Sequence, residues 1–205
     1  MRHIVLDTET TGLSRKSDRV VEIAAMEFNP ETGETADYYH VYLNPDQLMP
    51  ANIVRIHGIS NAFAQTQPRF EEEAAAFVGF IRGARLFIHN APFDRDMLDA
   101  EFARLELDEL TSYVESIVCT VALAKSVFPG KRNSLDALCD RFGVNRSKRR
   151  KHGALIDCEL LAEVVPHLHA AKEGRTLALP VAVREESWLR ALARRCLGSI
   201  SAGVR

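Results

Sequence analysis

Two acidic side chains stand where the N-terminal apolar run of the chain ends. Asp7 and Glu9 follow the stretch Arg2–Leu6 and are two residues apart. Because successive strand residues alternate between faces, both carboxylates point to one face at the end of a strand. Crowded carboxylates repel each other unless a cation lies between them. The pair therefore predicts a cation site, although a solvated acidic loop explains it equally well.

Two further acids and a histidine lie at other element boundaries. Asp94 follows the apolar run 86–88, at a strand-to-helix junction of the kind where open sheets bind ligands. A first-turn helix charge is the alternative interpretation of Asp94. Asp157 lies near the apolar side of a predicted helix, where an acid needs a partner. His152 lies in the preceding loop and faces the same cleft, unless it is an ordinary exposed histidine.

Taken together, these residues predict a metal centre. Four carboxylates are hard oxygen donors, which suit Mg²⁺ or Mn²⁺. A pair of such ions is a known device for in-line attack on a phosphodiester.

The elements that carry these residues indicate a mixed α/β fold. Three strands in succession suggest an antiparallel meander, and a stretch of alternating helix and strand follows. This order favours one mixed sheet covered by helices. The expected strands are 2–6, 20–28, 38–43 and 86–88; residues 116–127 begin as a strand or helix and continue as a helix; the expected helices are 70–81, 91–105, 134–142 and 153–169.

The composition argues against several classes of protein. The chain has 205 residues, of which 46% are apolar and 26% are charged, values typical of a folded domain. No run approaches 18 apolar residues and no signal-peptide core is present, so we expect a cytoplasmic protein without a membrane partner. The four cysteines are widely spaced, which argues against a disulfide framework or a zinc site.

The charge distribution divides the chain into a domain and a tail. Residues 173–205 hold six arginines and three glutamates, a net charge of +3, which leaves −5 for residues 1–172. An acidic body binds nucleic acid poorly unless it carries metal ions or local basic patches. We therefore expect a catalytic domain over 1–172 and a C-terminal tail over 173–205.

The motifs DTETTG, HNAPFD and HGALID, in this order, resemble those of the DEDDh family of 3′–5′ exonucleases. Within that family, the stretch FPGKRNSLDALCDRFGV is similar to the proofreading subunits of bacterial DNA polymerase III. The resemblance implies a ribonuclease-H-like fold with a central mixed five-stranded sheet flanked by helices. It also implies removal of mispaired nucleotides from DNA 3′ ends as monophosphates, by a metal-dependent reaction.

Roles for individual residues follow from the same resemblance. It implies that Asp7, Glu9, Asp94 and Asp157 bind two Mg²⁺ or Mn²⁺ ions, that Asp7 bridges both ions, and that His152 is the general base. Asn52 stands where relatives carry a substrate-contacting glutamate, and it retains the ability to hydrogen-bond a 3′-hydroxyl. The other residues implied to lie around the terminal nucleotide are Thr8, Leu13, Ile56, His57 and Phe93, with Ile56 and His57 against the bases.

A basic run comes directly before the catalytic histidine. The segment RSKRRK has five positive charges in six residues. It predicts a clamp for the phosphate backbone of the incoming strand, formed by Lys148, Arg149, Arg150 and Lys151. A solvated loop is the alternative.

The tail predicts an interaction with a partner. Residues 185–197 place Trp188, Leu189 and Leu192 on one stripe of an amphipathic helix. Such a helix can fold back, self-associate or dock into a partner groove. The resemblance favours docking on the DNA polymerase III catalytic subunit, while residues 174–179 are a weak likeness of a sliding-clamp-binding peptide.

Two other functions remain open at this level. An RNA-trimming exonuclease would use the same chemistry and would differ in contacts to the 2′-hydroxyl. A non-catalytic module that stabilises a polymerase would be expected to lack at least one of the five centre residues, and all five are present.

Overall fold

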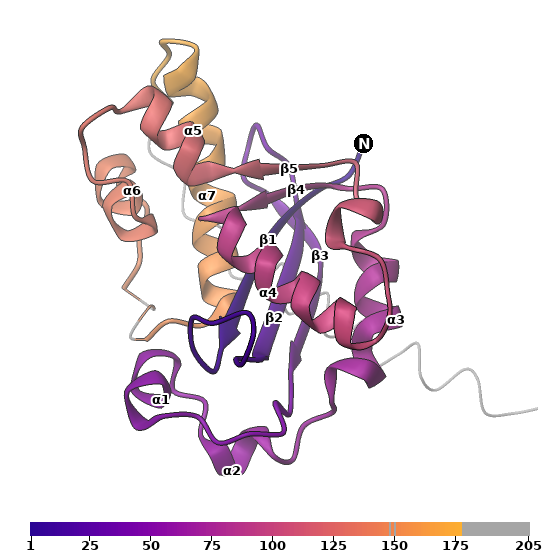
Figure 1. The fold of residues 1–205 in the computed structure, drawn as a ribbon. Coiled ribbons are helices and arrows are strands. Elements are labelled where there is room, and N and C mark those ends of the chain that lie inside the picture. Colours follow the sequence, from indigo (N-terminus) through magenta and orange to yellow (C-terminus); the bar gives the residue numbers. More distant parts are fainter. Residues whose placement is uncertain (148, 150, 178–205) are drawn as a thin grey trace, which may run out of the picture.

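A mixed five-stranded sheet forms the centre of the protein (Figure 1). The computed structural model describes residues 1–147, 149 and 151–177. The strand order is β3-β2-β1-β4-β5, with β1, β4 and β5 parallel and with β2 antiparallel to both β1 and β3. This arrangement confirms the predicted meander and sheet. The strands are β1 (His3–Thr10), β2 (Val20–Phe28), β3 (Thr35–Tyr42), β4 (Arg85–Ile88) and β5 (Ser116–Cys119).

Helices cover both faces of the sheet (Figure 1). Alternate residues of β1 face opposite layers, so Ile4 and Leu6 pack in one core with α3 and α4, while Val5 packs in another with α5, α6 and α7. Two short helices, α1 and α2, lie beyond the end of β1. The helices are α1 (Ala51–His57), α2 (Asn61–Ala64), α3 (Phe70–Ile81), α4 (Ala91–Arg104), α5 (Thr120–Val127), α6 (Leu135–Phe142) and α7 (Ala154–Lys172), and a 3₁₀ turn spans Leu110–Ser112.

The first strand is longer than the sequence predicts. The prediction ended the strand at Leu6 and placed Asp7 at the start of a loop, which is wrong. The strand continues because Asp7 and Glu9 remain paired with Ala24 and Glu22 of β2, and the register shifts only after Glu9. Sheet hydrogen bonds thus hold both carboxylates on one face, on rigid backbone rather than on a loop.

A left-handed residue turns the chain from β4 into α4. Asn90 has φ 73°, a conformation that asparagine tolerates better than most residues. It occupies the predicted cap position, but its side chain makes no capping hydrogen bond within the described part of the chain. The sharp turn places Asp94 in the first turn of α4, directly beyond the end of the strand.

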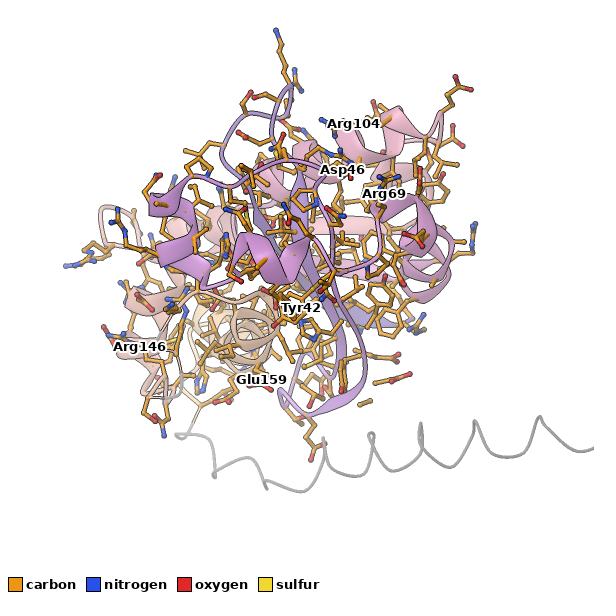
Figure 2. The ribbon with its side chains drawn as sticks, turned by 90° about the horizontal axis from the view of Figure 1, so that it is seen from below. Tyr42, Asp46, Arg69, Arg104, Arg146 and Glu159 are labelled. Carbon is orange, nitrogen blue, oxygen red and sulfur yellow. The ribbon has the colours of Figure 1, made fainter. Side chains whose placement is uncertain are left out.

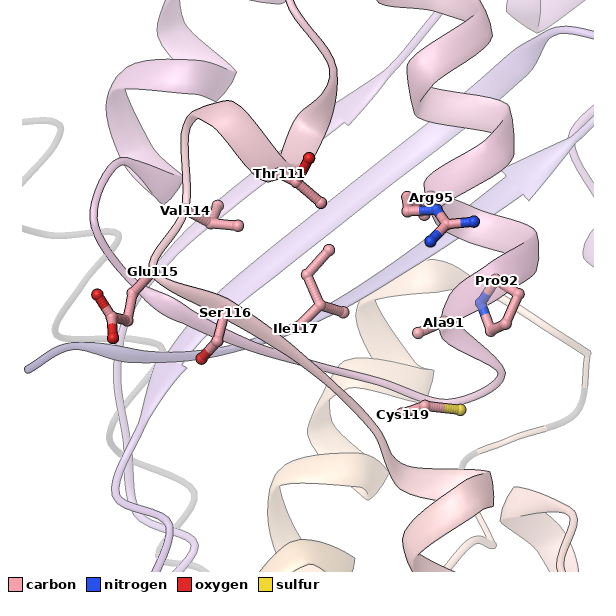
Figure 3. A pocket seen from close by; sticks show the side chains of 9 residues that line it. All are labelled: Ala91, Pro92, Arg95, Thr111, Val114, Glu115, Ser116, Ile117 and Cys119. Atoms are coloured by element: carbon pink, nitrogen blue, oxygen red, sulfur yellow. The ribbon is translucent and has the colours of Figure 1, made fainter.

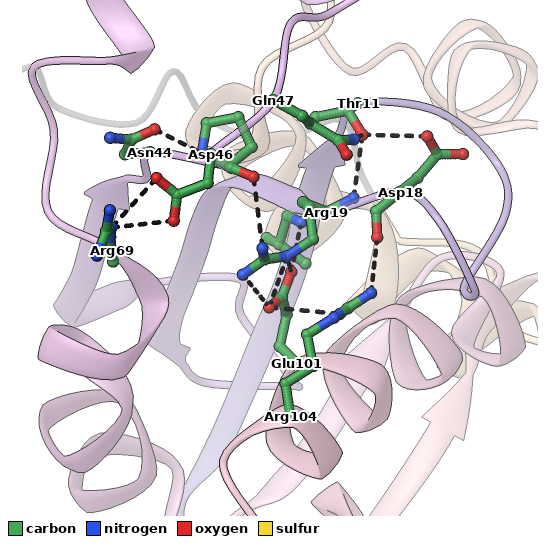
Figure 4. Close-up of polar contacts among 11 residues, drawn as sticks. Thr11, Asp18, Arg19, Asn44, Asp46, Gln47, Arg69, Glu101 and Arg104 are labelled. Atoms are coloured by element: carbon green, nitrogen blue, oxygen red, sulfur yellow. Dashed lines mark hydrogen bonds and ion pairs between the residues drawn. The ribbon is translucent and has the colours of Figure 1, made fainter.

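A buried ion pair fastens α4 to the loop that follows β1 (Figure 4). Glu101 accepts hydrogen bonds from Arg19 Nε at 2.8 Å and Nη2 at 2.9 Å, and from the Val20 backbone N–H at 3.0 Å. Arg104, one turn later, reaches the Asp18 carbonyl at 3.4 Å. This network fixes the loop beside the C-terminal end of β1, where the predicted site lies.

The tail prediction falls outside the described residues. The helix expected over 185–197 lies beyond residue 177, the last described residue, and the last described helix, α7, ends at Lys172. Within the described ranges, no helix combines the length and the apolar character needed to cross a membrane.

Candidate active site

The site forms where the parallel pairing of β1 with β4 ends. Leu6 pairs with Ile88 in the sheet, so the residues just beyond them meet at one edge. Asp94 enters from the α3/α4 layer, and its Oδ1 accepts hydrogen bonds from the Thr8 backbone N–H at 3.1 Å and from Thr8 Oγ1 at 2.8 Å. Thr8 therefore anchors Asp94 against β1.

The opposite layer supplies the remaining members of the centre. Asp157 lies in the first turn of α7, which packs on β1 and β2. The ligand atoms of Glu9, His152 and Asp157 all lie within 4.8 Å of one another. The His152 backbone N–H donates to the Ile56 carbonyl at 3.1 Å, which ties the histidine loop to α1.

The carboxylates crowd each other strongly. Burial, followed by the charges of Asp94, Asp157 and Glu9, raises the pKa of Asp7 well above its ordinary value. Burial also raises the pKa of Glu9 to about 8, with further contributions from Glu22 and Asp157. These directions mean that the folded protein disfavours the charged forms unless a cation compensates them. A cluster of hard, mutually repelling oxygen donors fits Mg²⁺ or Mn²⁺.

Asp157 is the exception because it already has a cation beside it. Burial alone would raise its pKa, but the adjoining side chains of His152 and Arg149, with the charge of Arg149, hold the pKa below its ordinary value. The Arg149 side chain is only 8% exposed. It is thus part of the centre, whereas the sequence predicted a surface clamp.

Sequence reasoning missed a fifth carboxylate at the centre. Glu22 of β2 lies directly opposite Glu9 in the sheet and is 2% exposed. His40 Nε2 lies 2.8 Å from Glu22 Oε1, so the acid is paired on the side away from Glu9. An acid inside the otherwise apolar stretch VVEIAAM was the signal that could have identified it.

The predicted nucleotide contacts differ in accessibility. Leu13, in the loop after β1, is 83% exposed, and Ile56 and Asn52 of α1 are also exposed. Phe93 is partly buried in the first turn of α4. His57 is 7% exposed, and its Nδ1 accepts the Ile59 backbone N–H at 3.0 Å. Among these residues, exposed apolar surface thus comes from Leu13 and Ile56, while His57 supports the turn after α1.

The basic run is only partly described. Lys148 and Arg150 lie outside the described residues. Lys151 is exposed, and its side chain passes so close to Gly58 that a Cβ there would meet Lys151 Cδ at 2.8 Å. Gly58 has φ 83°, and this left-handed backbone favours glycine at the position, whereas the flexible Lys151 side chain could move aside.

A groove of about 380 Å³ lies between the edge strand β5 and the start of α4 (Figure 3). Its lining is mostly apolar or small, with Arg95 and Glu115 as the charged members. The predicted site residues are not among those that line it in the described structure. We therefore place the chemistry at the acidic centre rather than in this groove.

Comparison with known proteins identifies the class. A family model described as Exonuclease (RNase_T) matches residues 4–165, and the chain belongs to this family. The nuclease domain of 3′hExo, described as a DEDDh family member bound to rAMP, has a TM-score of 0.72 at 13% identity and covers 89% of this chain and 97% of its own. That likeness shows the ribonuclease-H-like fold alone.

Closer relatives carry a specific name. DNA polymerase III subunit epsilon of Escherichia coli is 44% identical over 169 residues, which are 80% of this chain and 69% of the relative. The subunit of the same name from Pasteurella multocida is 42% identical over 80% of this chain and 66% of its own length. Exonuclease X in complex with 5′ overhanging duplex DNA is 25% identical with a TM-score of 0.64, covering 87% of this chain and 96% of its own. The chain thus spans about two thirds of the length of the subunits it matches.

The crowded acids should make the stability of the metal-free protein fall as pH rises. The pKa of Glu9 is raised to about 8 from an ordinary 4.5, so the folded state holds this proton more tightly than the unfolded chain. The resulting stability is lost as pH rises through the folded pKa. In EDTA, we expect Tm to fall by about 3–6 °C between pH 6.5 and 8.5, given about 1.4 kcal/mol per pKa unit and partial exposure of Glu9.

Scanning calorimetry checks this expectation. His57 and His89, whose pKa values burial lowers, act in the opposite direction, and their effect fades as pH rises above 6.5, the ordinary histidine value. Glu9→Gln should flatten the fall, and saturating Mn²⁺ should remove it. A Tm that rises over this interval in EDTA would contradict the charge assignment of the centre.

Proposed function

We propose that the protein is a metal-dependent 3′–5′ exonuclease that releases nucleoside monophosphates from DNA 3′ ends and proofreads during replication. The observation that carries the proposal is the convergence of Asp7, Glu9, Asp94, Asp157 and His152 at one sheet edge. Family membership and 42–44% identity to epsilon subunits support it.

The four carboxylates are the residues that would hold two Mg²⁺ or Mn²⁺ ions. Asp7 would contact both positions: burial raises its pKa, and Asp94, Asp157 and Glu9 raise it further because they surround it. Bound divalent ions supply Lewis-acid stabilisation of the scissile phosphate and activate water. His152, which is exposed at the mouth of the centre, takes the proton from the attacking water.

Side chains around the mouth position the terminal nucleotide. Leu13 and Ile56 offer exposed apolar surface for the base. Asn52, exposed at the start of α1, hydrogen-bonds the 3′-hydroxyl, and Phe93 and Thr8 form the wall beside Asp94. Lys151 contributes a positive charge for the phosphate backbone.

Oligonucleotide hydrolysis tests the proposed activity. We expect 5′-labelled DNA with a single 3′ mismatch to shorten one nucleotide at a time with Mg²⁺ or Mn²⁺, and EDTA to stop the reaction. Matched DNA and RNA of the same sequence are compared in parallel, since contacts to the 2′-hydroxyl distinguish the two. A preference for RNA would assign the protein to RNA trimming instead of proofreading. A substrate that stays intact with either metal would refute the nuclease assignment.

The proposed partner is the catalytic subunit of DNA polymerase III, bound through residues 173–205 in the cytoplasm. Support comes from the names of the relatives and from the apolar stripe of residues 185–197 in the sequence. A contact of residues 174–179 with the sliding clamp is the weaker part of this proposal. Co-elution with the catalytic subunit should be lost when residues 173–205 are deleted, while exonuclease rate and Tm stay nearly unchanged.

A further inference from the structure

Arg149 is bound into the acidic centre by four short contacts. Its Nε and Nη2 donate to the two oxygens of Asp157 at 2.5 and 2.6 Å, a bidentate arrangement. Its Nη1 donates to Asp136 Oδ1 of α6 at 2.7 Å, and Nη2 also lies 2.7 Å from His152 Nδ1. The guanidinium is therefore one of the best-satisfied groups in the described structure.

These contacts occupy the groups that the reaction needs. Both oxygens of Asp157 are engaged by the positively charged guanidinium, so a metal ion at this carboxylate would lie against a second cation. An arginine N–H can only donate, so His152 Nδ1 must be the acceptor, and the proton of a neutral ring is then on Nε2. In this arrangement, the ring has no lone pair left to accept a proton from water.

The guanidinium lies against the side chains that would hold a metal ion. The ligand atoms of Glu9, His152 and Asp157 lie within 4.8 Å of one another, and Arg149 contacts two of these three residues directly. Its charge also acts on Glu9, whose pKa it lowers against the effect of burial. A divalent ion and this guanidinium would compete for the same carboxylate, because two cations held at one carboxylate repel each other.

We propose that Arg149 is the internal counter-cation of the metal-free centre, which a divalent ion must displace from Asp157 and His152 before the site becomes competent. The inference rests on the proposed metal-dependent function. It makes metal entry the step that frees both the carboxylate and the base. The protein would then be held inactive, with its acids neutralised, until the metal concentration suffices to release Arg149.

Calorimetric titration of Mn²⁺ without nucleic acid tests the proposal. Arg149→Ala should bind Mn²⁺ about tenfold more tightly than the wild type. A factor of about ten in affinity corresponds to the loss of roughly one hydrogen bond to a charged group. The variant should also melt at a lower temperature in EDTA and gain more in Tm from Mn²⁺. Arg149→Lys keeps the charge but cannot span Asp157 in the bidentate manner, so an intermediate affinity is expected even if the alanine variant folds poorly.

Arg146→Ala is the matched control. Arg146 belongs to the same basic run, pairs with Asp140 at 2.8 Å and lies at the periphery of the molecule (Figure 2). Its removal changes the net charge equally but leaves the centre intact, so its Mn²⁺ affinity should change less than twofold. Equal affinities for Arg149→Ala and Arg146→Ala, or weaker binding by Arg149→Ala, would overturn the proposal.

A direct readout comes from the arginine side-chain resonances. In the metal-free protein, the ¹⁵N-labelled Nε–H of Arg149 should be protected from exchange by Asp157, and Mg²⁺ should shift it or expose it. A resonance that stays unchanged at saturating Mg²⁺ would also overturn the proposal. Failure of the exonuclease function is distinguishable, because it would show as intact DNA while Mn²⁺ binding and the effect of Arg149 persist.

Discussion

Replacing Asp7 by alanine should remove nearly all exonuclease activity, a loss on the order of 10³-fold or more. Metal stabilisation of the transition state contributes several kcal/mol, and each 1.36 kcal/mol is about tenfold in rate. Asp7 should bridge both ions, so no other single carboxylate can replace it. The measurement is the rate of nucleotide release from a 3′-mismatched DNA at saturating Mn²⁺.

The same substitution should leave the fold intact and stabilise it without metal. Burial and three neighbouring acids raise the pKa of Asp7, so its removal relieves repulsion in the folded state. We expect a higher Tm than that of the wild type in EDTA at pH 8. Asp37→Ala, which removes an exposed carboxylate on β3, is the matched control and should change neither rate nor Tm appreciably. Activity of Asp7→Ala within about tenfold of the wild type would refute the two-metal assignment.

His152→Ala should lower the rate by about 10²–10⁴-fold, the usual contribution of a general base. Binding of Mn²⁺ and of a nucleoside monophosphate should persist, because His152 is proposed to move a proton rather than to hold the ion. His152→Tyr should retain part of the activity, since a phenol can also exchange a proton from this position. Single-turnover rates with parallel metal titrations measure both properties.

The pH profile separates this role from a structural one. A base that takes a proton in the reaction gives the wild-type rate a pH dependence that the alanine variant should lack. A collapse of metal affinity in His152→Ala would instead make His152 a ligand. The His152 ring lies close enough to Glu9 and Asp157 to bind a metal ion with them. Measuring metal affinity beside the rate therefore separates a ligand from a general base.

Much of the fold was predictable because its strands and helices differ in periodicity. The three-strand meander and the helix at 70–81 carry clear apolar patterns, and the structure has them. The helix predicted over 91–105 was indicated by Asn90 as a cap and by Pro92 in its first turn, and α4 ends one residue earlier, at Arg104. The length of β1 was not predictable in this way. Asp7 and Glu9 look like loop residues by polarity, and only pairing with Ala24 and Glu22 keeps them in the strand.

The sequence indicated which acids belong to the candidate site better than it indicated which side chains pair with them. Four acids at element boundaries indicated where the strand ends would meet, because parallel strands end at one sheet edge. The positions of Glu22 and Arg149 depend on contacts between elements distant in sequence. Glu22 is defined by its register opposite Glu9, and Arg149 by the approach of α6 and α7. A basic run by itself indicates a solvated face or a phosphate clamp, and it does not reveal that one arginine turns inward.

Anomalous diffraction at the manganese edge, from crystals grown with Mn²⁺ and a nucleoside monophosphate, tests the central claim most directly. The account predicts two manganese peaks at the end of β1, with Asp7 in contact with both, Asp157 on one of them, and the Arg149 guanidinium withdrawn from Asp157. A single peak remote from Asp7, or no peak with Arg149 still bonded to Asp157 at saturating Mn²⁺, would contradict it.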